Sequence, residues 1–114
     1  MVEEFEKYVN NYDLTKEKII LKKNHSIRVM NLCIKYAKKL GFNDDDVSLA
    51  KVIGLLHDIG RFEQLKEFNS FDDSNIDHAD LGVKILFEEG LIKNFWSNKE
   101  DYELIEFAIK NHNK

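Results

Sequence analysis

The chain contains no proline and a single cysteine, Cys33, and these absences limit the class of protein that it can be. A lone cysteine cannot form an internal disulfide, which fits the reducing cytosol. No apolar run approaches the ~20 residues of a membrane-spanning helix, and the acidic N-terminus does not resemble a signal peptide. A net charge of -4 argues against non-specific binding to nucleic acid. We therefore expect a cytoplasmic protein that binds neither a membrane nor nucleic acid.

Low-complexity tracts, repeats and Gly/Ser linkers are also absent, so we expect one domain over residues 1–114. A chain of 114 residues can bury a modest core, and apolar residues make up 43% of it. These residues recur with a helical period almost throughout, and no alternating run is long enough for a strand. The pattern predicts an all-α bundle of about five or six helices.

The ends of the predicted helices follow from capping residues and glycines. The helices are expected over residues 2–11, 14–40, 43–60, 74–90 and 97–111, with a break near 23–24 left open. Asn43 is the expected cap of the third helix. Ser74 and Ser97 each precede an acid by three residues, as in a capping box. Glycine favours the position just past the end of a helix. Three of these helices are therefore expected to end at a glycine: Gly41, Gly60 and Gly90. Residues 61–73 are expected to form a loop with a short helical turn.

The chain has four histidines, each on a different predicted helix: His25, His57, His78 and His112. A helix turns 100° per residue, so each histidine shares a face with apolar residues of its own helix. On the second helix, that face includes Leu32, Tyr36 and Leu40. A single buried histidine is more often part of a core than a metal ligand. Burying four imidazoles without partners would cost ~1–3 kcal/mol each, and a shared divalent metal would remove all of these costs together.

The adjacent pair His57-Asp58 adds a second argument for a metal. Neighbours on a helix diverge by 100°, so both can bind one ion only near a helix end or through a bridging carboxylate. Gly60 is expected to provide that end. Gly54 and Gly82 each lie near a histidine and would leave room for close helix approach or for a cavity.

The strings around the histidines resemble those of a known family. The chain reads KNHSIRV at His25, LLHDIGR at the pair, IDHADLG at His78 and KNHN at His112. These strings resemble the HD superfamily of metal-dependent phosphohydrolases, an all-helical family defined by a His, a His-Asp doublet and a final Asp. Members with two further histidines resemble the binuclear subset, and His78 and His112 match those positions.

The resemblance implies a ligand set and a reaction. His25, His57 and Asp58 would hold one divalent ion, and Asp58 would bridge to a second held by His78 and His112. The cofactor would be one or two ions of Mn, Fe, Ni, Zn, Co or Mg. Asp58 would thus be a catalytic residue in the attack of a metal-activated water on a small phosphorylated compound or nucleotide.

Two arginines are candidates for binding the substrate. Arg61 lies one turn past His57 and offers a planar fork for phosphate oxygens, although it would also suit the end of a helix as a solvated cation. It is therefore also a candidate catalytic residue. Arg28 is the second candidate, and pairing with an acid at the edge of the core is its alternative. Lys22 and Lys23 are expected to be solvated.

Other side chains near the motifs have simpler explanations. Glu63 and Asp77 are expected to be a surface acid and a helix cap, in preference to groups that orient an imidazole. The phenylalanines near the doublet are expected to pack, in preference to stacking on a base: Phe62, Phe68 and Phe71.

One departure from the family pattern concerns its last aspartate. The sequence stops at Lys114, and Asp101 precedes His112, which makes it a poor substitute by order. We therefore expect a C-terminally incomplete domain with weakened metal binding and with exposed apolar surface that favours association with another copy. Two other functions stay open: a non-catalytic metal- or ligand-binding regulatory module, and a di-iron oxygenase on the same ligand set.

Overall fold

The computed structural model describes residues 1–74 and 76–112, and these residues form helices and turns without a strand. The main helices are α1 (Val2–Val9), α2 (Glu17–Lys39), α3 (Asp44–Leu56), α4 (Gly60–Phe68), α5 (His78–Val83) and α6 (Tyr102–Asn111). Shorter turns join α5 to α6: the π-helical η1 (Lys84–Glu88), and the 3-10 turns η2 (Leu91–Asn94) and η3 (Lys99–Asp101). The prediction of an all-α fold is confirmed. In this part of the chain, no helix is long and apolar enough to cross a membrane.

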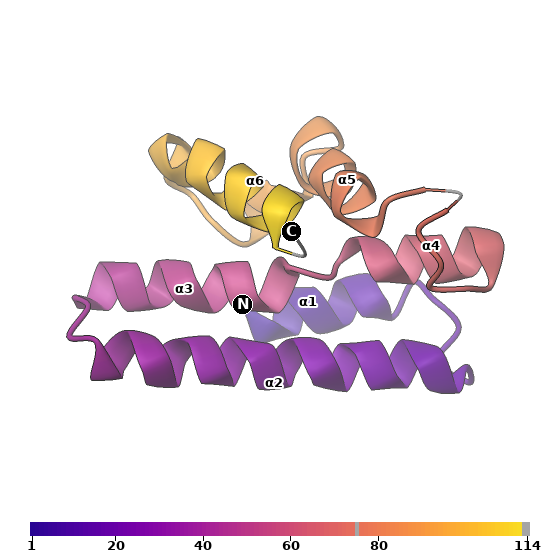
Figure 1. Ribbon diagram of the computed structural model, residues 1–114, viewed down its shortest axis with the longest axis horizontal. Helices are drawn as coiled ribbons and strands as arrows, with labels where there is room; N and C mark the ends of the chain where they lie inside the picture. The colour runs from indigo at the N-terminus through magenta and orange to yellow at the C-terminus, as the bar shows by residue number, and fades with distance from the viewer. Residues whose placement is uncertain (75, 113–114) are drawn as a thin grey trace.

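The helices form two layers (Figure 1). In the first layer, α2 and α3 run side by side in opposite directions, α1 packs near them, and α4 follows α3 after a short break. In the second layer, α5 packs against α4 and α6. The C-terminal end of α6 lies close to the break between α3 and α4. That break is therefore the place where the two layers meet.

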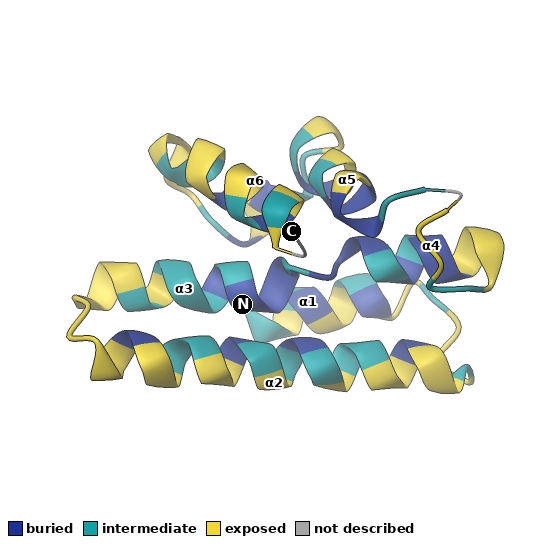
Figure 2. Cartoon of the chain, in the orientation of Figure 1, coloured by how far each residue is buried: buried dark blue, intermediate teal, exposed yellow. Residues whose placement is uncertain are grey.

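Apolar side chains from both layers share one core, which appears dark blue in Figure 2. Phe5 of α1, Leu55 of α3 and Ile105 of α6 are each 0% exposed. Full burial of one side chain of this size stabilises the fold by ~1.5–3 kcal/mol. The contact between the layers is thus largely apolar, and the polar groups that lie within it are concentrated at the break.

The C-terminal end of α2 and the N-terminal end of α3 match the sequence prediction. Gly41 has a φ of 78°, the left-handed conformation that glycine adopts without strain just past a helix. The side chain of Asn43 accepts a hydrogen bond from the backbone N–H of Asp46 at 2.8 Å. It therefore caps α3 as expected.

Two other predicted caps are wrong by one to three residues. Asp77, and not Ser74, caps α5, because its carboxylate accepts a hydrogen bond from the N–H of Ala79 at 2.8 Å. Asn98, and not Ser97, caps η3 in the same way. A capping-box spacing does not reveal which of several neighbouring polar residues adopts the extended backbone that a cap needs.

The largest correction concerns Gly60. α3 ends at Leu56, and Gly60 begins α4 instead of ending the preceding helix. A Cβ at Gly60 would collide with the backbone carbonyl of His78 and would lie 2.7 Å from the N of Gly82. This glycine is therefore needed for the close approach of α5 to α4, and not to end a helix.

The loop expected over residues 61–73 is also wrong, because α4 extends to Phe68. Phe62 and Leu65, three residues apart, are 0% and 1% exposed and bury one face of this helix. Charged and polar residues of both signs next to these two positions hide the helical period in the sequence.

The predicted inner face of α2 is wrong in its second half. Helix α2 is continuous, so residues 23–24 do not interrupt it. Leu32, Tyr36 and Leu40, which share the face of His25, are 43%, 54% and 72% exposed. The buried positions include Met30, which is 5% exposed. Apolar residues occur on more than one face of α2, so periodicity alone does not identify the buried face.

Candidate metal centre

Asp58 lies in the turn between α3 and α4, and its side chain is only 7% exposed. Four imidazole Nε2 atoms surround its carboxylate. Those of His25 and His57 both lie 3.4 Å from Oδ2. Those of His78 and His112 lie 3.3 Å and 3.2 Å from Oδ1. We call these five side chains the histidine–aspartate cluster. The structure thus brings together all the residues that the sequence identified as candidate ligands.

The cluster is assembled from four separate elements, mostly at helix ends. His25 lies within α2, whereas His57 directly follows α3 and His78 is the first residue of α5. His112 directly follows α6, near the break between α3 and α4 (Figure 1). Asp58 lies between the end of α3 and the start of α4, where the four imidazoles converge. The carboxylate can therefore face all four imidazoles.

Two histidines are oriented by backbone carbonyl groups three residues earlier in the chain. The Nδ1 of His57 lies 2.7 Å from the carbonyl oxygen of Gly54, and the Nδ1 of His112 lies 2.6 Å from that of Ile109. Carbonyl oxygens only accept hydrogen bonds, so each Nδ1 bears the hydrogen. In the neutral ring, Nε2 then has a free lone pair, which is the state that binds a metal.

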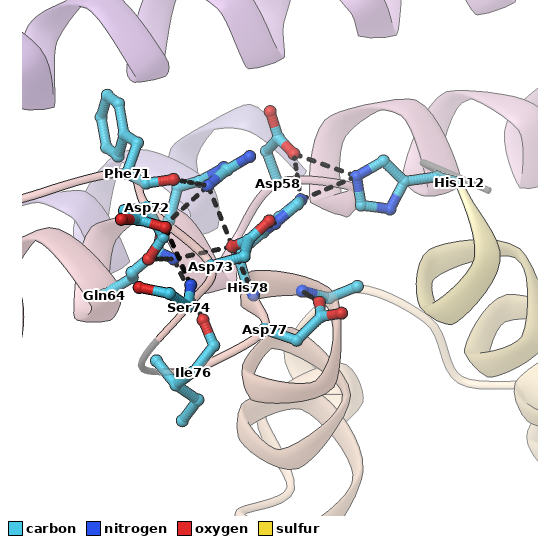
Figure 3. A network of polar contacts seen from close by, with 12 residues as sticks. Asp58, Gln64, Phe71, Asp72, Asp73, Ser74, Ile76, Asp77, His78 and His112 are labelled. Carbon is cyan, nitrogen blue, oxygen red and sulfur yellow. Dashed lines mark hydrogen bonds and ion pairs between the residues drawn. The ribbon is translucent and has the colours of Figure 1, made fainter.

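His78 is oriented by a carboxylate. Both oxygens of Asp73 lie 3.1 Å from its Nδ1, and Oδ1 also accepts a hydrogen bond from the backbone N–H of His78 at 3.1 Å. The amide of Gln64, which is 0% exposed, donates a hydrogen bond to Asp73 at 2.8 Å. Figure 3 shows Asp73 between Gln64 and His78. A carboxylate on the far nitrogen of a histidine is typical of metal ligands, because it fixes the ring and makes Nε2 more basic.

The cluster has more acceptors than hydrogens. The neutral rings of His57, His78 and His112 all direct Nε2 lone pairs toward Asp58, and the Nε2 atoms of His78 and His112 are only 3.0 Å apart. Lone pairs at these distances repel unless a positive group lies between them. Protonation of one ring supplies one hydrogen, which leaves the remaining contacts unsatisfied. The set of donors therefore fits divalent cations, for which imidazole and carboxylate are common ligands.

The ligand atoms fall into two groups of three. His25, His57 and Asp58 form one group, and Asp58, His78 and His112 form the other, with the atoms of each group within 4.8 Å of one another. Asp58 belongs to both groups because its two oxygens face different pairs of histidines. This arrangement suits two ions with a bridging carboxylate.

The surroundings keep the charges of the cluster suited to a cation. Burial raises the pKa of Asp58, but its contacts with His112, His57 and His78 outweigh burial and hold this pKa well below its usual range. Burial, and then the charge of Lys22, lower the pKa of His25. The carboxylate is therefore anionic and the imidazole of His25 is favoured in its neutral form, as metal ligands must be. The contact with Asp58 raises the pKa of His112 and favours its protonated form, so binding of an ion there would release a proton.

Lys22 is a member of the site that the sequence prediction missed. Its Nζ donates a hydrogen bond to Oδ2 of Asp58 at 3.0 Å, and its side chain is only 19% exposed. The expectation that this lysine is solvated is therefore wrong. A signal was present, since Lys22 precedes His25 by three residues and so shares its helix face.

The two candidate substrate-binding arginines already have partners. The Nη1 of Arg61 donates hydrogen bonds to the carbonyl oxygen of Phe71 at 2.7 Å and to Oδ1 of Asp73 at 3.2 Å. The Nη2 of Arg28 lies 3.2 Å from the Nδ1 of His25. Both guanidinium groups thus lie beside the cluster, and their contact with a substrate stays a prediction.

Three acids lie outside the ligand set. Asp77 is a helix cap, as expected, and Glu63 accepts a hydrogen bond from the hydroxyl of Tyr12 at 3.1 Å. Asp101 accepts one from the indole of Trp96 at 2.9 Å, at the opposite end of α6 from the cluster. It does not replace the last aspartate of the family pattern. The orienting acid, Asp73, was missed because it lies in a loop without periodicity.

A helical domain in which three helix ends and the middle of α2 direct four imidazoles at one buried carboxylate has a candidate divalent-metal centre. The chain belongs to the HD domain family, whose family model matches residues 23–114, and thus to the HD superfamily of metal-dependent phosphohydrolases. Over 62 residues it is 44% identical to Ribonuclease Y 1 of Pediococcus pentosaceus. This match covers 54% of the chain but 10% of that relative, so the chain spans only a small part of it. No solved structure matches the chain significantly.

Proposed function

We propose that this domain hydrolyses a phosphate ester of a small molecule or nucleotide with the help of one or two divalent ions. The observation that supports this proposal best is the position of Asp58, whose two oxygens each face a different pair of histidines. A bridging carboxylate between two sets of imidazoles suits the two-metal hydrolysis of phosphate esters.

The residues of the site would have three roles in hydrolysis: metal binding, alignment of the histidine rings and phosphate binding. Bound divalent ions would lower the pKa of water from ~15.7 toward ~7 and neutralise charge on the phosphate. Asp58 and the four imidazoles would hold these ions, and the hydrogen bonds at Nδ1 would keep the rings aligned. Arg61 and Arg28 would contact phosphate oxygens, once Arg61 exchanges a loop contact for the substrate.

The name of the relative supports the same class of reaction. A ribonuclease cleaves phosphodiester bonds, so phosphodiesters are also candidate substrates of this domain. Because the match covers 10% of that protein, it supports the class of chemistry and not the particular substrate. The predicted association with another copy of the chain also stays a proposal, supported by Leu104 and Phe107 on α6, which are 52% and 66% exposed.

Metal binding and hydrolysis can be tested with Asp58→Asn. The purified chain should bind one or two Mn²⁺ ions and hydrolyse p-nitrophenyl phosphate or bis(p-nitrophenyl) phosphate. The variant should bind metal at least about 100-fold more weakly, because even residues that only orient ligands change affinity ~10–100-fold. Metal analysis, calorimetric titration and nitrophenol release measure these effects.

The matched control is Asp80→Asn, which removes an exposed acid on α5. It should bind metal and turn over substrate like the wild type. Metal binding that survives Asp58→Asn would contradict the proposed centre. Binding without turnover would favour a regulatory module, and oxygen consumption with Fe(II) would favour the oxygenase; either result would overturn the proposed hydrolysis.

A further inference from the structure

A row of positive side chains lies beside the histidine–aspartate cluster. Lys18 and Lys22 are one helical turn apart on α2, a rise of ~6 Å. Their Nζ atoms lie 5.8 Å and 5.5 Å from the centre of the Phe71 ring. The guanidinium carbon of Arg61 lies 5.6 Å from the same ring. The chain has a net charge of -4, but the three cations make the surroundings of this ring locally positive.

These three cations differ in how they are paired. Lys22 pairs with Asp58, and Arg61 bonds to the loop that contains Phe71. Lys18 is exposed, and over residues 1–74 and 76–112 no carboxylate pairs with it. The face of Phe71 attracts both ammonium groups and keeps them on this side of α2. Lys18 is therefore a positioned positive charge that is available to a ligand.

Lys22 would need a different partner if the centre held a metal. Its ammonium contacts the same oxygen of Asp58 that faces His25 and His57. A divalent ion bound by these three residues would repel the nearby positive charge of Lys22. An anion between the ion and the ammonium removes this repulsion. The phosphoryl group of a substrate is such an anion, and Lys22 lies where it would be bound.

From this arrangement we infer that Lys18 and Lys22 form a subsite for a substrate with two phosphate groups. Lys22 contacts the phosphate at the metal centre, and Lys18 contacts a second phosphate about one helical turn, ~5–6 Å, away. This inference rests on the proposed function and specifies its substrate class: a bisphosphorylated nucleoside or a similar small molecule. Phe71 acts by holding the two lysines in line.

Binding of two nucleotides to the Mn²⁺-loaded chain tests the subsite. Thymidine 3′,5′-bisphosphate should bind about tenfold more tightly than thymidine 5′-phosphate, which corresponds to one added charged contact of ~1.4 kcal/mol. In Lys18→Gln, this preference should fall to about twofold, because either phosphate of the bisphosphate can still enter the metal centre. The affinity for the 5′-phosphate should stay unchanged. Lys22→Gln should weaken binding of both nucleotides. Isothermal titration calorimetry measures all of these affinities.

Lys23→Gln is the matched control, because this lysine neighbours Lys22 but points 100° away around the helix. It should keep the wild-type preference. Equal preference in Lys18→Gln and Lys23→Gln, or a wild-type preference of twofold or less, would overturn the subsite. If the wild type still binds and hydrolyses the 5′-phosphate, only the subsite is wrong. If it binds neither metal nor nucleotide, the proposed function fails as well.

Discussion

Two groups of polar side chains join the helices of this protein, and they differ in their supply of hydrogens. In the tyrosine network, the hydroxyl of Tyr12 donates to Glu63 at 3.1 Å and lies 2.6 Å from the hydroxyl of Tyr8. Because Tyr12 uses its hydrogen on Glu63, Tyr8 donates to Tyr12. Every hydrogen between these groups has an acceptor, so the network is complete without a ligand.

The histidine–aspartate cluster lacks this balance. The Nε2 atoms of His78 and His112 face each other at 3.0 Å, and both also face Asp58. Their Nδ1 atoms already bear the hydrogens of the neutral rings. A balanced network joins helices, whereas a network with surplus acceptors attracts a cation. The same chemical principle, that buried polar groups need partners, thus separates a structural contact from a functional one.

The largest effect is expected from Gly60→Ala, which disrupts the cluster and spares the tyrosine network. The new Cβ would collide with the carbonyl of His78 and push α5 away from α4. We expect a loss of about 3 kcal/mol in the free energy of unfolding, the upper range for overpacking, together with weaker metal binding. Urea denaturation and metal titration measure the two effects.

Gly82→Ala provides the comparison from the other side of the same contact. Its Cβ would have its nearest neighbours at 3.4 Å, on Gly60 and Ile59. We expect a loss below about 1 kcal/mol, because such a contact needs only small shifts. Equal losses in the two variants would mean that the approach of the helices does not depend on Gly60.

A smaller effect is expected from Tyr12→Phe, which breaks the tyrosine network. The change leaves Tyr8 and Glu63 without their shared partner, at a cost of about 1–3 kcal/mol. Metal binding should stay unchanged, since these residues do not contact the cluster. Tyr36→Phe, at a side chain that is 54% exposed, is the control for loss of a hydroxyl. A change in metal affinity in Tyr12→Phe would contradict the independence of the two groups.

The smallest effect is expected from alkaline pH. Burial raises the pKa of Tyr8 from 10.0 to about 12. The folded state therefore holds this proton more tightly than the unfolded state. Its contribution to stability is complete below pH 10 and is lost as the pH rises toward about 12. Tyr8→Phe should lose stability less steeply over this range in urea titrations, and an equal slope would refute this assignment.

Local chemistry allowed much of the fold to be predicted. Asn43 caps its helix because an amide oxygen can reach a backbone N–H three residues on. Gly41 ends α2 because glycine adopts a positive φ without strain. The sequence did not reveal α4, whose buried pair Phe62 and Leu65 lies among charged and polar residues. The helical period there becomes clear only once the rest of the core is in place.

The candidate site divides in the same way. The four histidines and Asp58 could be selected because imidazole and carboxylate are the usual ligands of catalytic metals. Lys22 shares the helix face of His25, but its partner Asp58 lies 36 residues further along the chain, so the sequence did not reveal their contact. Asp73 lies only five residues before His78, but its role depends on the shape of the loop between α4 and α5.

By itself, the sequence determined the helical class and the types of the candidate ligands, because residue type and helical periodicity are local properties. The strings around its histidines carried the resemblance to the family, which the family model then showed. The tertiary structure alone decided which oxygen of Asp58 faces which histidines, which groups orient the rings, and which lysine contacts the cluster. These relations depend on the close packing of α5 on α4 at Gly60 and on the end of α6, and so on contacts between distant parts of the chain.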